Sequence, residues 1–255
     1  MDCHELMLAK LQLSGFDFSF YVFGESFSHR WWLNEVSRGV WEQHLLESFS
    51  RSIRLGDTIF DIGAWLGPYT MLASRLVGDT GTIYAFEPDS VARDLLSKNV
   101  VENGCRNVII VDRAVSDHDG IVSLAPGTHL GDSTSSITTK GISSVAVQST
   151  SLDSFCERKA TSPDVLKIDA EGAEHLILSG IGRAVKTVRL LFVEFHHGLL
   201  ESEELTLYKF IQKTKSLTGL SPSLVDTAMR TSTIAFSSQL SPPKTGDIVV
   251  KPAVE

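Results

Sequence analysis

The stretch TIFDIGAWLGPYTMLASRLVGDTGTIYAFE (58–87) decides the fold. A short β-rich run (58–62) leads through a glycine-containing turn into an apolar-striped helix (69–77), and a second strand (82–87) follows. The alternation continues downstream, with strands expected at 107–112, 164–169 and 189–195 and helices at 89–104, 171–180 and 202–214. Strands that are apolar almost throughout and alternate with helices predict an α/β fold with a mostly parallel sheet covered on both faces.

The segment before this alternation is expected to be a small addition. Residues 1–54 form a predicted N-terminal cap, with one helix over 35–49, and residues 55–255 form the main domain. Trp31, Trp32 and Trp41 in the cap are expected to be packing anchors, because aromatic side chains bury a large area.

Two further runs interrupt or follow the strand–helix alternation. The runs 121–126 and 144–152 predict a hairpin, and the loop 126–144 between them is rich in Gly, Ser and Thr. Its composition and place predict a lid over a ligand. Near the end of the chain, SLVDT and TSTIAF are expected to supply the closing strands of the sheet.

The composition narrows the function classes. The chain has 255 residues, 42% of them hydrophobic, and a formal net charge of −8, which fits one soluble globular domain. The acidic balance argues against a nucleic-acid partner. Three scattered cysteines and the lack of metal-ligand spacing predict no metal site, although a divalent ion held by Asp169 stays an alternative. Neither a signal peptide nor a membrane span is evident, so a cytoplasmic location is expected.

In such sheets, ligands bind beyond the carboxyl ends of the strands. The first of these ends reads D-x-G-x-x-x-G from Asp61 to Gly67. Gly63 permits a tight turn and a close approach of the backbone to a ligand, and Gly67 lets the helix begin close to the strand. A carboxylate at Asp61 would repel a pyrophosphate and suits a ligand with a positive group, such as an amine or sulfonium. The spacing also lacks the G-x-G-x-x-G pattern of dinucleotide sites.

The next two strand ends carry acids in positions suited to a nucleoside. Glu87 follows Asp61 at the end of the second strand and is placed to accept the hydroxyl groups of a ribose. Asp112 and the residues up to Ala114 end the third strand, where Asp112 either accepts an adenine amine or makes an ordinary turn.

The last two strand ends concentrate ionisable groups. Lys167 and Asp169 share a strand face, and Glu171 and Glu174 follow at a helix start, where Glu174 is assigned to the helix dipole. His196 ends the fifth strand, and a histidine at the rim of a cleft can take a proton near neutral pH. These side chains predict acid–base chemistry at one edge of the sheet.

The blocks FDIGAWLGPYT, YAFEPDSVARDLLSKNV, AVSDHDG, SLDSF, VLKIDAEGAEHLILSG and FVEFH occur in this order. Together they resemble the FkbM family of S-adenosylmethionine-dependent methyltransferases over about residues 57–200. The resemblance implies a class I methyltransferase fold, Rossmann-like, with seven strands and an antiparallel C-terminal hairpin. It also implies S-adenosylmethionine as cofactor and O-methylation of a hydroxyl group on a small molecule, a sugar or a specialised metabolite.

The resemblance also implies roles for single residues. The methionine and ribose side of the cofactor would be lined by Asp61, Gly63, Ala64 and Gly67. Glu87 would hold the ribose, Asp112 to Ala114 would flank the adenine, and Asp169 would face the reacting centre. The family commonly has Asn where this chain has Trp65, so an indole there is expected to reshape the pocket.

For the chemistry, His196 is expected to take the hydroxyl proton and Asp169 to orient the acceptor, with Glu171 as the less favoured base. Two other functions stay open. A nicotinamide-dependent oxidoreductase is disfavoured by Asp61 and the missing third glycine. A non-catalytic cofactor-binding module would keep Glu87 and the glycine turn but would not need Asp169 and His196. The oligomeric state is left open.

Overall fold

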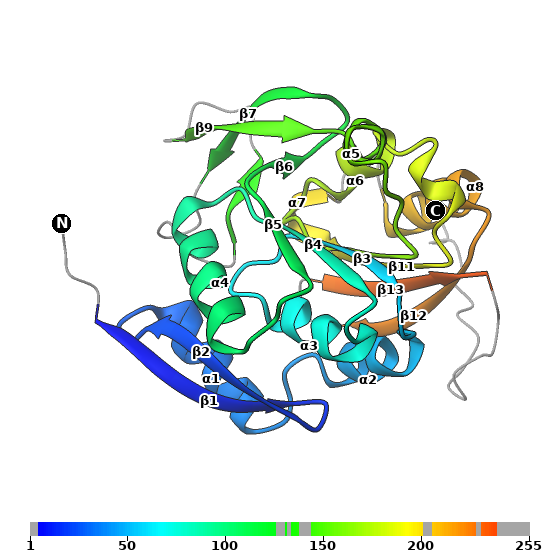
Figure 1. Ribbon diagram of the computed structural model, residues 1–255. Helices are drawn as coiled ribbons and strands as arrows, with labels where there is room; N and C mark the ends of the chain where they lie inside the picture. The colour runs from blue at the N-terminus through cyan, green and yellow to red at the C-terminus, as the bar shows by residue number, and fades with distance from the viewer. Residues whose placement is uncertain are drawn as a thin grey trace, which may run out of the picture.

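The structure is a computed structural model that describes residues 5–125, 131, 134–137, 144–200, 206–227 and 231–238. Its centre is a seven-stranded sheet in the order β12-β13-β11-β10-β3-β4-β5 (Figure 1). The strands are β3 (Thr58–Ile62), β4 (Thr82–Phe86), β5 (Val108–Val111), β10 (Val165–Ile168), β11 (Leu190–His196), β12 (Ser221–Thr227) and β13 (Thr231–Ser237).

Strand direction confirms the fold class predicted from the sequence. β3, β4, β5, β10 and β11 run parallel, while β13 runs antiparallel to both β11 and β12. The carboxyl ends of the five parallel strands therefore meet at one edge of the sheet, which is where the sequence places its ionisable side chains.

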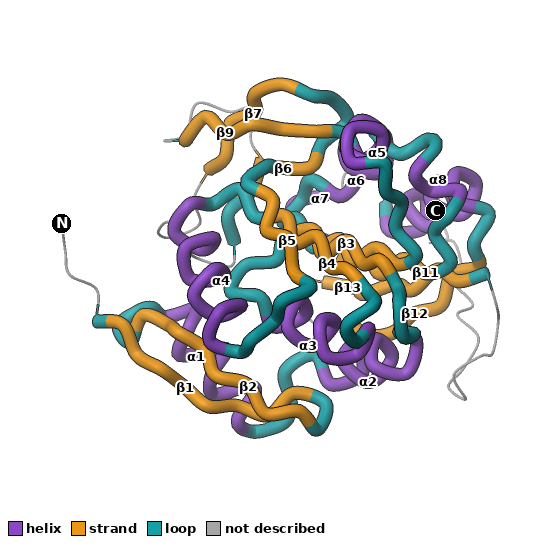
Figure 2. The backbone as a smooth tube through the Cα atoms, in the orientation of Figure 1, coloured by secondary structure: helices purple, strands orange, loops and turns teal. Residues whose placement is uncertain are grey.

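Helices cover both faces of the sheet, as Figures 1 and 2 show. One face packs against α2 (Gln43–Ser52), α3 (Pro68–Val77) and α4 (Ser90–Glu102), and the other against α5 (Leu152–Lys159), α6 (Glu174–Ser179) and α8 (Leu207–Thr218). Successive residues of β3 serve the two faces, since Ile59 packs with α2 and α3 while Phe60 packs with α5 and α6. The short segments η1 (Ala184–Lys186) and α7 (His197–Leu200) complete this half.

The N-terminal region is a hairpin with a helix. β1 (Leu6–Leu13) pairs antiparallel with β2 (Phe16–Phe23), and α1 (Phe27–Ser37) follows. Alternate residues of β2 are buried, and Phe20 packs edge-to-face on Trp32 with ring centroids 4.9 Å apart. Trp32 is thus a packing anchor as predicted, whereas Trp31 is 52% exposed, so its assignment as an anchor is wrong.

The predicted single helix over 35–49 is wrong, because the chain breaks between α1 and α2. Gly39 and Glu42 both have left-handed backbone, with φ of +68° and +42°. An α-helix cannot continue through two left-handed residues that lie three positions apart. The break turns Trp41 and Glu42 toward the edge of the sheet where the parallel strands end, so both line the cavity described below.

A second, smaller sheet confirms the predicted hairpin. β7 (Gly120–Ala125) pairs antiparallel with β9 (Val145–Thr150) and with β8 (Ser136–Ile137), and β6 (Ala114–Val115) lies beside β9. Most of the loop 126–144 predicted as a lid lies outside the described residues, so the lid stays a prediction.

Two helices begin later than the sequence suggests. α6 begins at Glu174 rather than 171, because Glu171 and Gly172 adopt left-handed backbone with φ of +47° and +97°. α8 begins at Leu207, where the side chain of Thr206 accepts a hydrogen bond from the backbone of Lys209. Ser202, the expected start, lies outside the described residues. No described helix is both long enough and apolar enough to span a membrane.

Candidate active site

A cavity of about 1310 Å³ lies at the carboxyl ends of the parallel strands. Its wall is continuous from the N-terminal region to β11 and includes most of the residues singled out from the sequence: Asp61, Gly63, Ala64, Glu87, Ala114, Asp169, Glu171 and His196. Gly67 and Asp112 are the two that do not line it. The edge of the sheet chosen from topology is therefore also the edge that is hollowed.

The turn after β3 is built on close backbone contacts. Gly63 has φ of +78°, and a Cβ atom there would lie 1.8 Å from the carbonyl oxygen of Asp169. The N–H groups of Gly63 and Ala64 both donate to the carbonyl of Phe86. Only glycine fits this position, since both the φ angle and the space exclude a side chain.

Gly67 has a packing function rather than a place in the cavity wall. It precedes α3 with φ of +89°, and a Cβ atom there would lie 2.4 Å from the side chain of Leu96 on α4. The absence of a side chain lets α3 approach α4 and fixes where the N-terminus of α3 lies.

Asp61 is buried at 2% exposure at the base of the cavity. Its Oδ2 accepts a hydrogen bond of 2.6 Å from the hydroxyl of Thr70, and Lys167 lies 3.8 Å from Oδ1. Among the described residues, no group donates a hydrogen bond to Oδ1. A buried acceptor without a donor is costly, so this oxygen suits a ligand that brings an N–H group.

Glu87 is held by the two backbone segments that flank it in the cavity wall. Its Oε2 accepts from the N–H of Trp65 and its Oε1 from the N–H of Asp89, both at 2.8 Å. Burial raises the pKa of Glu87 to about 7, against the opposing effect of these two hydrogen bonds. Each carboxylate oxygen retains a lone pair for a further donor.

Trp65 stands in a conformation that bulky residues rarely adopt, with φ of +50°. Such backbone costs about 1–3 kcal/mol for a residue other than glycine. Its indole N–H donates a 3.0 Å hydrogen bond to the carbonyl of Gly131, and its ring packs against Trp32 and His29 with centroids 5.5 Å away. The indole therefore ties the cofactor side of the cavity to the N-terminal region.

Three residues that follow β5 form part of the cavity wall. Arg113, Ala114 and Val115 line the cavity, whereas Asp112 is exposed and lies outside the lining. The role of Asp112 beside an adenine stays a prediction.

Lys167 is a buried cation at the centre of the acidic end of the cavity. Its Nζ lies 3.2 Å from Oδ2 of Asp169 and 3.8 Å from Oδ1 of Asp61, and 4.8 Å from the ring centre of Tyr69. Burial alone would lower the pKa of Lys167, but the charges of Asp169 and Asp61 raise it above its usual value. Burial would raise the pKa of Asp169, and the charges of Lys167 and His196 lower it instead.

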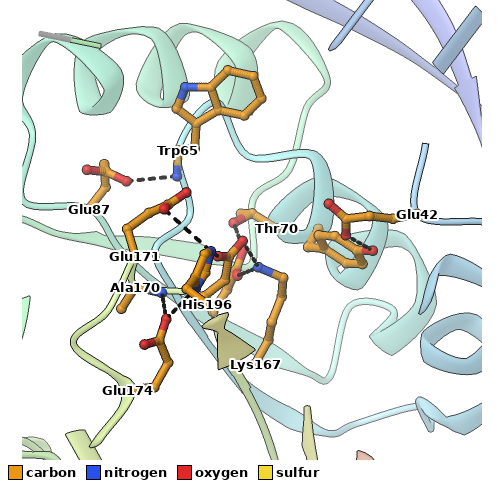
Figure 3. A network of polar contacts seen from close by, with 12 residues as sticks. Glu42, Trp65, Thr70, Glu87, Lys167, Ala170, Glu171, Glu174 and His196 are labelled. Carbon is orange, nitrogen blue, oxygen red and sulfur yellow. Dashed lines mark hydrogen bonds and ion pairs between the residues drawn. The ribbon is translucent and has the colours of Figure 1, made fainter. Parts of the chain in front are cut away.

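Glu174 holds both the turn before α6 and the imidazole of His196 (Figure 3). Its fully buried Oε1 accepts from the N–H groups of Ala170 and Gly172 at 3.2 Å and lies 2.8 Å from Nδ1 of His196. From the sequence, Glu174 is assigned only to the helix dipole. This contact, which joins α6 to β11, is not predicted from the sequence. The contact directs Nε2 of His196 toward the cavity.

Nε2 of His196 lies 3.4 Å from Oε2 of Glu171 and 3.7 Å from Oδ1 of Asp169. Burial would lower the pKa of His196, but hydrogen bonds to Glu171 and Glu174 and the charge of Asp169 raise it to about 12. The surrounding carboxyl groups therefore favour the protonated form of the ring. Burial raises the pKa of Glu171.

The sequence-predicted catalytic residues thus form one cluster. One ligand atom each from Asp169, Glu171 and His196 lies within 4.8 Å of the others, a spacing that also suits a metal ion. Nζ of Lys167 lies 3.2 Å from Oδ2 of Asp169, so a metal ion held by this carboxylate would compete with the ion pair.

Comparison with known proteins agrees with the fold. The family description "Methyltransferase FkbM domain" matches residues 61–216. The hexuronic acid methyltransferase AglP of Haloferax volcanii is 26% identical over 189 residues, which are 74% of this chain and 74% of that protein.

Among solved structures, the methyltransferase FkbM from Methylobacillus flagellatus superimposes with a TM-score of 0.51 at 13% identity. The match covers 84% of this chain and 55% of that one, so this chain spans about half the length of that protein. At this identity the likeness concerns the fold, which is the class I methyltransferase fold.

Proposed function

The chain belongs to the FkbM methyltransferase family, and from this premise we propose that it transfers the methyl group of S-adenosylmethionine to a hydroxyl group of a sugar. The observation that carries the proposal is the meeting, in one cavity, of the glycine turn after β3 and Glu87 with the cluster of Asp169, Glu171 and His196. The choice of a sugar is supported by the relative that methylates a hexuronic acid.

The cavity fits the cofactor on features of its own wall. The turn at Gly63 presents backbone without a side chain to the cavity, and the Oδ1 atom of Asp61 needs a donor such as the cofactor's amine. The free lone pairs of Glu87 suit the two hydroxyl groups of a ribose, and Ala64 and Ala114 leave room beside it. When bound, S-adenosylmethionine supplies an electrophilic methyl group on a sulfonium.

The chain's own residues then have to align the acceptor and remove its proton. A base works best when its pKa lies near the operating pH. The pKa of His196 is raised, which favours the ring with its proton bound, and that of Asp169 is lowered, which makes it a weak base, while burial raises the pKa of Glu171 and makes it the stronger base. We therefore assign the proton to Glu171, with Asp169 orienting the acceptor and His196 holding both carboxylates in place.

This assignment moves the base from His196, which the sequence favours, to Glu171. Because the imidazole of His196 already holds a proton, it can stabilise the negative charge of its neighbours but has no vacant site for a second proton. Its substitution is expected to disturb catalysis through Asp169 and Glu171.

The N-terminal residues 1–54 are proposed as a cap that selects the acceptor, with residues 55–255 as the methyltransferase domain. The cap brings Trp41 and Glu42 into the wall on the side of β11, away from Glu87.

The direct test is methyl transfer from isotopically labelled S-adenosylmethionine to a panel of sugars, read by mass spectrometry. A methylated sugar is expected, and Glu171→Gln should lower the turnover by about 10²–10⁴-fold. The matched control is Glu157→Gln on α5, a surface carboxylate at 68% side-chain exposure. S-adenosylhomocysteine binding without transfer to any hydroxyl group would instead favour the non-catalytic module.

A further inference from the structure

Carboxyl groups outnumber cations at the end of the cavity that faces away from Glu87. Five acids line this end around two positive side chains, the acids being Glu42, Asp61, Asp169, Glu171 and Glu194 and the cations Lys167 and His196, and buried Glu174 lies behind His196. Such an excess of charge is expensive in a partly buried site unless bound protons or a cationic ligand offset it.

Both cations are already committed to other acids. Lys167 lies against Asp61 and Asp169, and His196 contacts Glu171 and Glu174 more closely than any other acid. Two acids are left over, Glu42 and Glu194.

Glu42 and Glu194 have no cation in direct contact. The carboxylate of Glu42 accepts a 2.7 Å hydrogen bond from the hydroxyl of Tyr69, and Glu194 shares a hydrogen bond with the carboxyl group of Asp169. Lys167 acts on both carboxyl groups, and His196 on Glu194, only from a greater distance. Within the described part of the chain, no cationic side chain comes within 4.0 Å of either carboxyl group. Burial raises the pKa of Glu42 to about 7, against the opposing charge of Lys167. Burial, and then the charges of Asp169 and Glu42, raise the pKa of Glu194 well above its usual value.

The cofactor does not account for these two acids. It brings one ammonium and one sulfonium group against one carboxylate, and the orphaned Oδ1 of Asp61 lies at the glycine turn where its amine is expected. Glu42 comes from the break before α2 and Glu194 from β11, so both face the part of the cavity left for the acceptor.

Building on the proposed function, we propose that the acceptor is an amino sugar whose ammonium group lies between Glu42 and Glu194. An ammonium group has three N–H donors and no acceptor, which matches two carboxyl groups that lack a cation. Exposed aromatic side chains at the mouth, Phe27 at 78% and Trp31 at 52%, offer an apolar surface for the face of a sugar ring. A hexuronic acid, the substrate of the relative AglP, would bring a further carboxylate into this acidic end.

The test measures binding separately from methyl transfer. The full chain is saturated with S-adenosylhomocysteine and titrated calorimetrically with the methyl glycosides of glucose, glucosamine, N-acetylglucosamine and glucuronic acid, and with the galactose counterparts. Hydrogen bonds to charged groups predict that the free amine binds about 10- to 100-fold more tightly than the hydroxyl or acetamido sugar of the same ring. The uronic acid should bind most weakly.

Variants assign the preference to the two acids. Glu42→Gln and Glu194→Gln should each reduce the preference for the amino sugar about tenfold, with little change in the affinity for the neutral sugar. Glu47→Gln is the matched control, because Glu47 lies on α2, the helix that follows Glu42, but pairs with Arg51 at the surface. The thermal shift with S-adenosylhomocysteine shows in each variant that the fold and cofactor side are intact.

The outcomes separate the inference from the proposed function. Equal binding of the amine and the neutral sugars, no binding of any sugar, or tighter binding of the uronic acid overturns the amino-sugar inference, even if methyl transfer to a neutral sugar upholds the function. A preference for the amine that both variants abolish upholds the inference, even if no methyl group is transferred. Recovery of uronic acid binding by magnesium would show that the surplus acids serve a divalent ion, which also overturns it.

Discussion

Lys167→Met tests whether the acidic end of the cavity depends on one buried ammonium group. The side chain of Lys167 is 5% exposed and lies between Asp169 and Asp61 on neighbouring strands. Methionine has a similar length and no charge, so the substitution removes the cation while it preserves most of the packing.

The distances set the size of the effect. At an effective dielectric constant of about 20, a charge pair at the observed 3.2 Å is worth about 5 kcal/mol and one at 3.8 Å about 4 kcal/mol before desolvation is subtracted. Removal of one partner from a buried pair costs about 3–5 kcal/mol net. For a domain of this size, that loss corresponds to a fall in Tm of about 10 °C.

The loss should depend on pH. The depressed pKa of Asp169 gives stability that is present above its unfolded pKa of about 3.9 and is lost as the pH falls through the lower folded pKa. In Lys167→Met, the pKa of Asp169 rises, and that of Asp61, which burial already raises, rises further, so the folded variant binds protons that the wild type does not. The stability difference should therefore shrink as the pH falls from about 7 to about 5.

Urea unfolding at several pH values measures this difference. Lys215→Met is the control, because Lys215 is exposed on α8 and its loss should change the free energy of unfolding by less than about 0.5 kcal/mol. A loss below about 1 kcal/mol at pH 7, or one that stays constant down to pH 5, would refute the central role assigned to Lys167.

Three further predictions concern the cavity wall. Glu87→Ala should remove most of the stabilisation by S-adenosylhomocysteine, which is about 2.7 kcal/mol at 100 times its Kd. A thermal-shift assay measures this loss. The control variant Glu102→Ala, at an exposed position, should retain the stabilisation, and NADH should not stabilise the wild type. Glu174→Gln should lower the pKa of His196 below about 12, as followed by NMR titration, and reduce kcat about tenfold with little change in KM; an unchanged titration would contradict the contact. Gly63→Ala should destabilise the fold by more than about 2 kcal/mol, visible in urea unfolding, because its Cβ would meet the carbonyl of Asp169; wild-type stability would show that the turn can open.

Periodicity and the position of strand ends were enough to predict the sheet and the edge that carries the cavity. Each βα unit is local in sequence, and parallel strands place their carboxyl ends together whatever the side chains are. This is why Asp61, Glu87, Asp169 and His196 could be selected before any distance was known.

Contacts between distant segments could not be predicted in this way. Glu42 enters the cavity only because the chain reverses at two left-handed residues, and a helical pattern over 35–49 hides that break. Glu174 reaches His196 because α6 packs on β11. The sequence does not show this packing, so the charge of Glu174 was explained only by its place at the start of a helix. The left-handed pair Glu171 and Gly172 offered a signal, since a glycine directly after an acid near a strand end is typical of a turn.

Trp65 shows how such distant contacts can stabilise an unfavourable local conformation. Asparagine tolerates left-handed backbone, whereas an indole at φ of +50° needs compensation from elsewhere. The hydrogen bond to Gly131 and the rings of Trp32 and His29 supply it, and they belong to the loop region after β7 and to the cap. Since the N–H of the same residue also holds Glu87, the conformation of the carboxylate proposed to bind the ribose is linked to the cap and to the region after β7. Under the proposed function, Trp65 would thus connect cofactor binding to acceptor selection, although its own preference opposes the conformation it adopts.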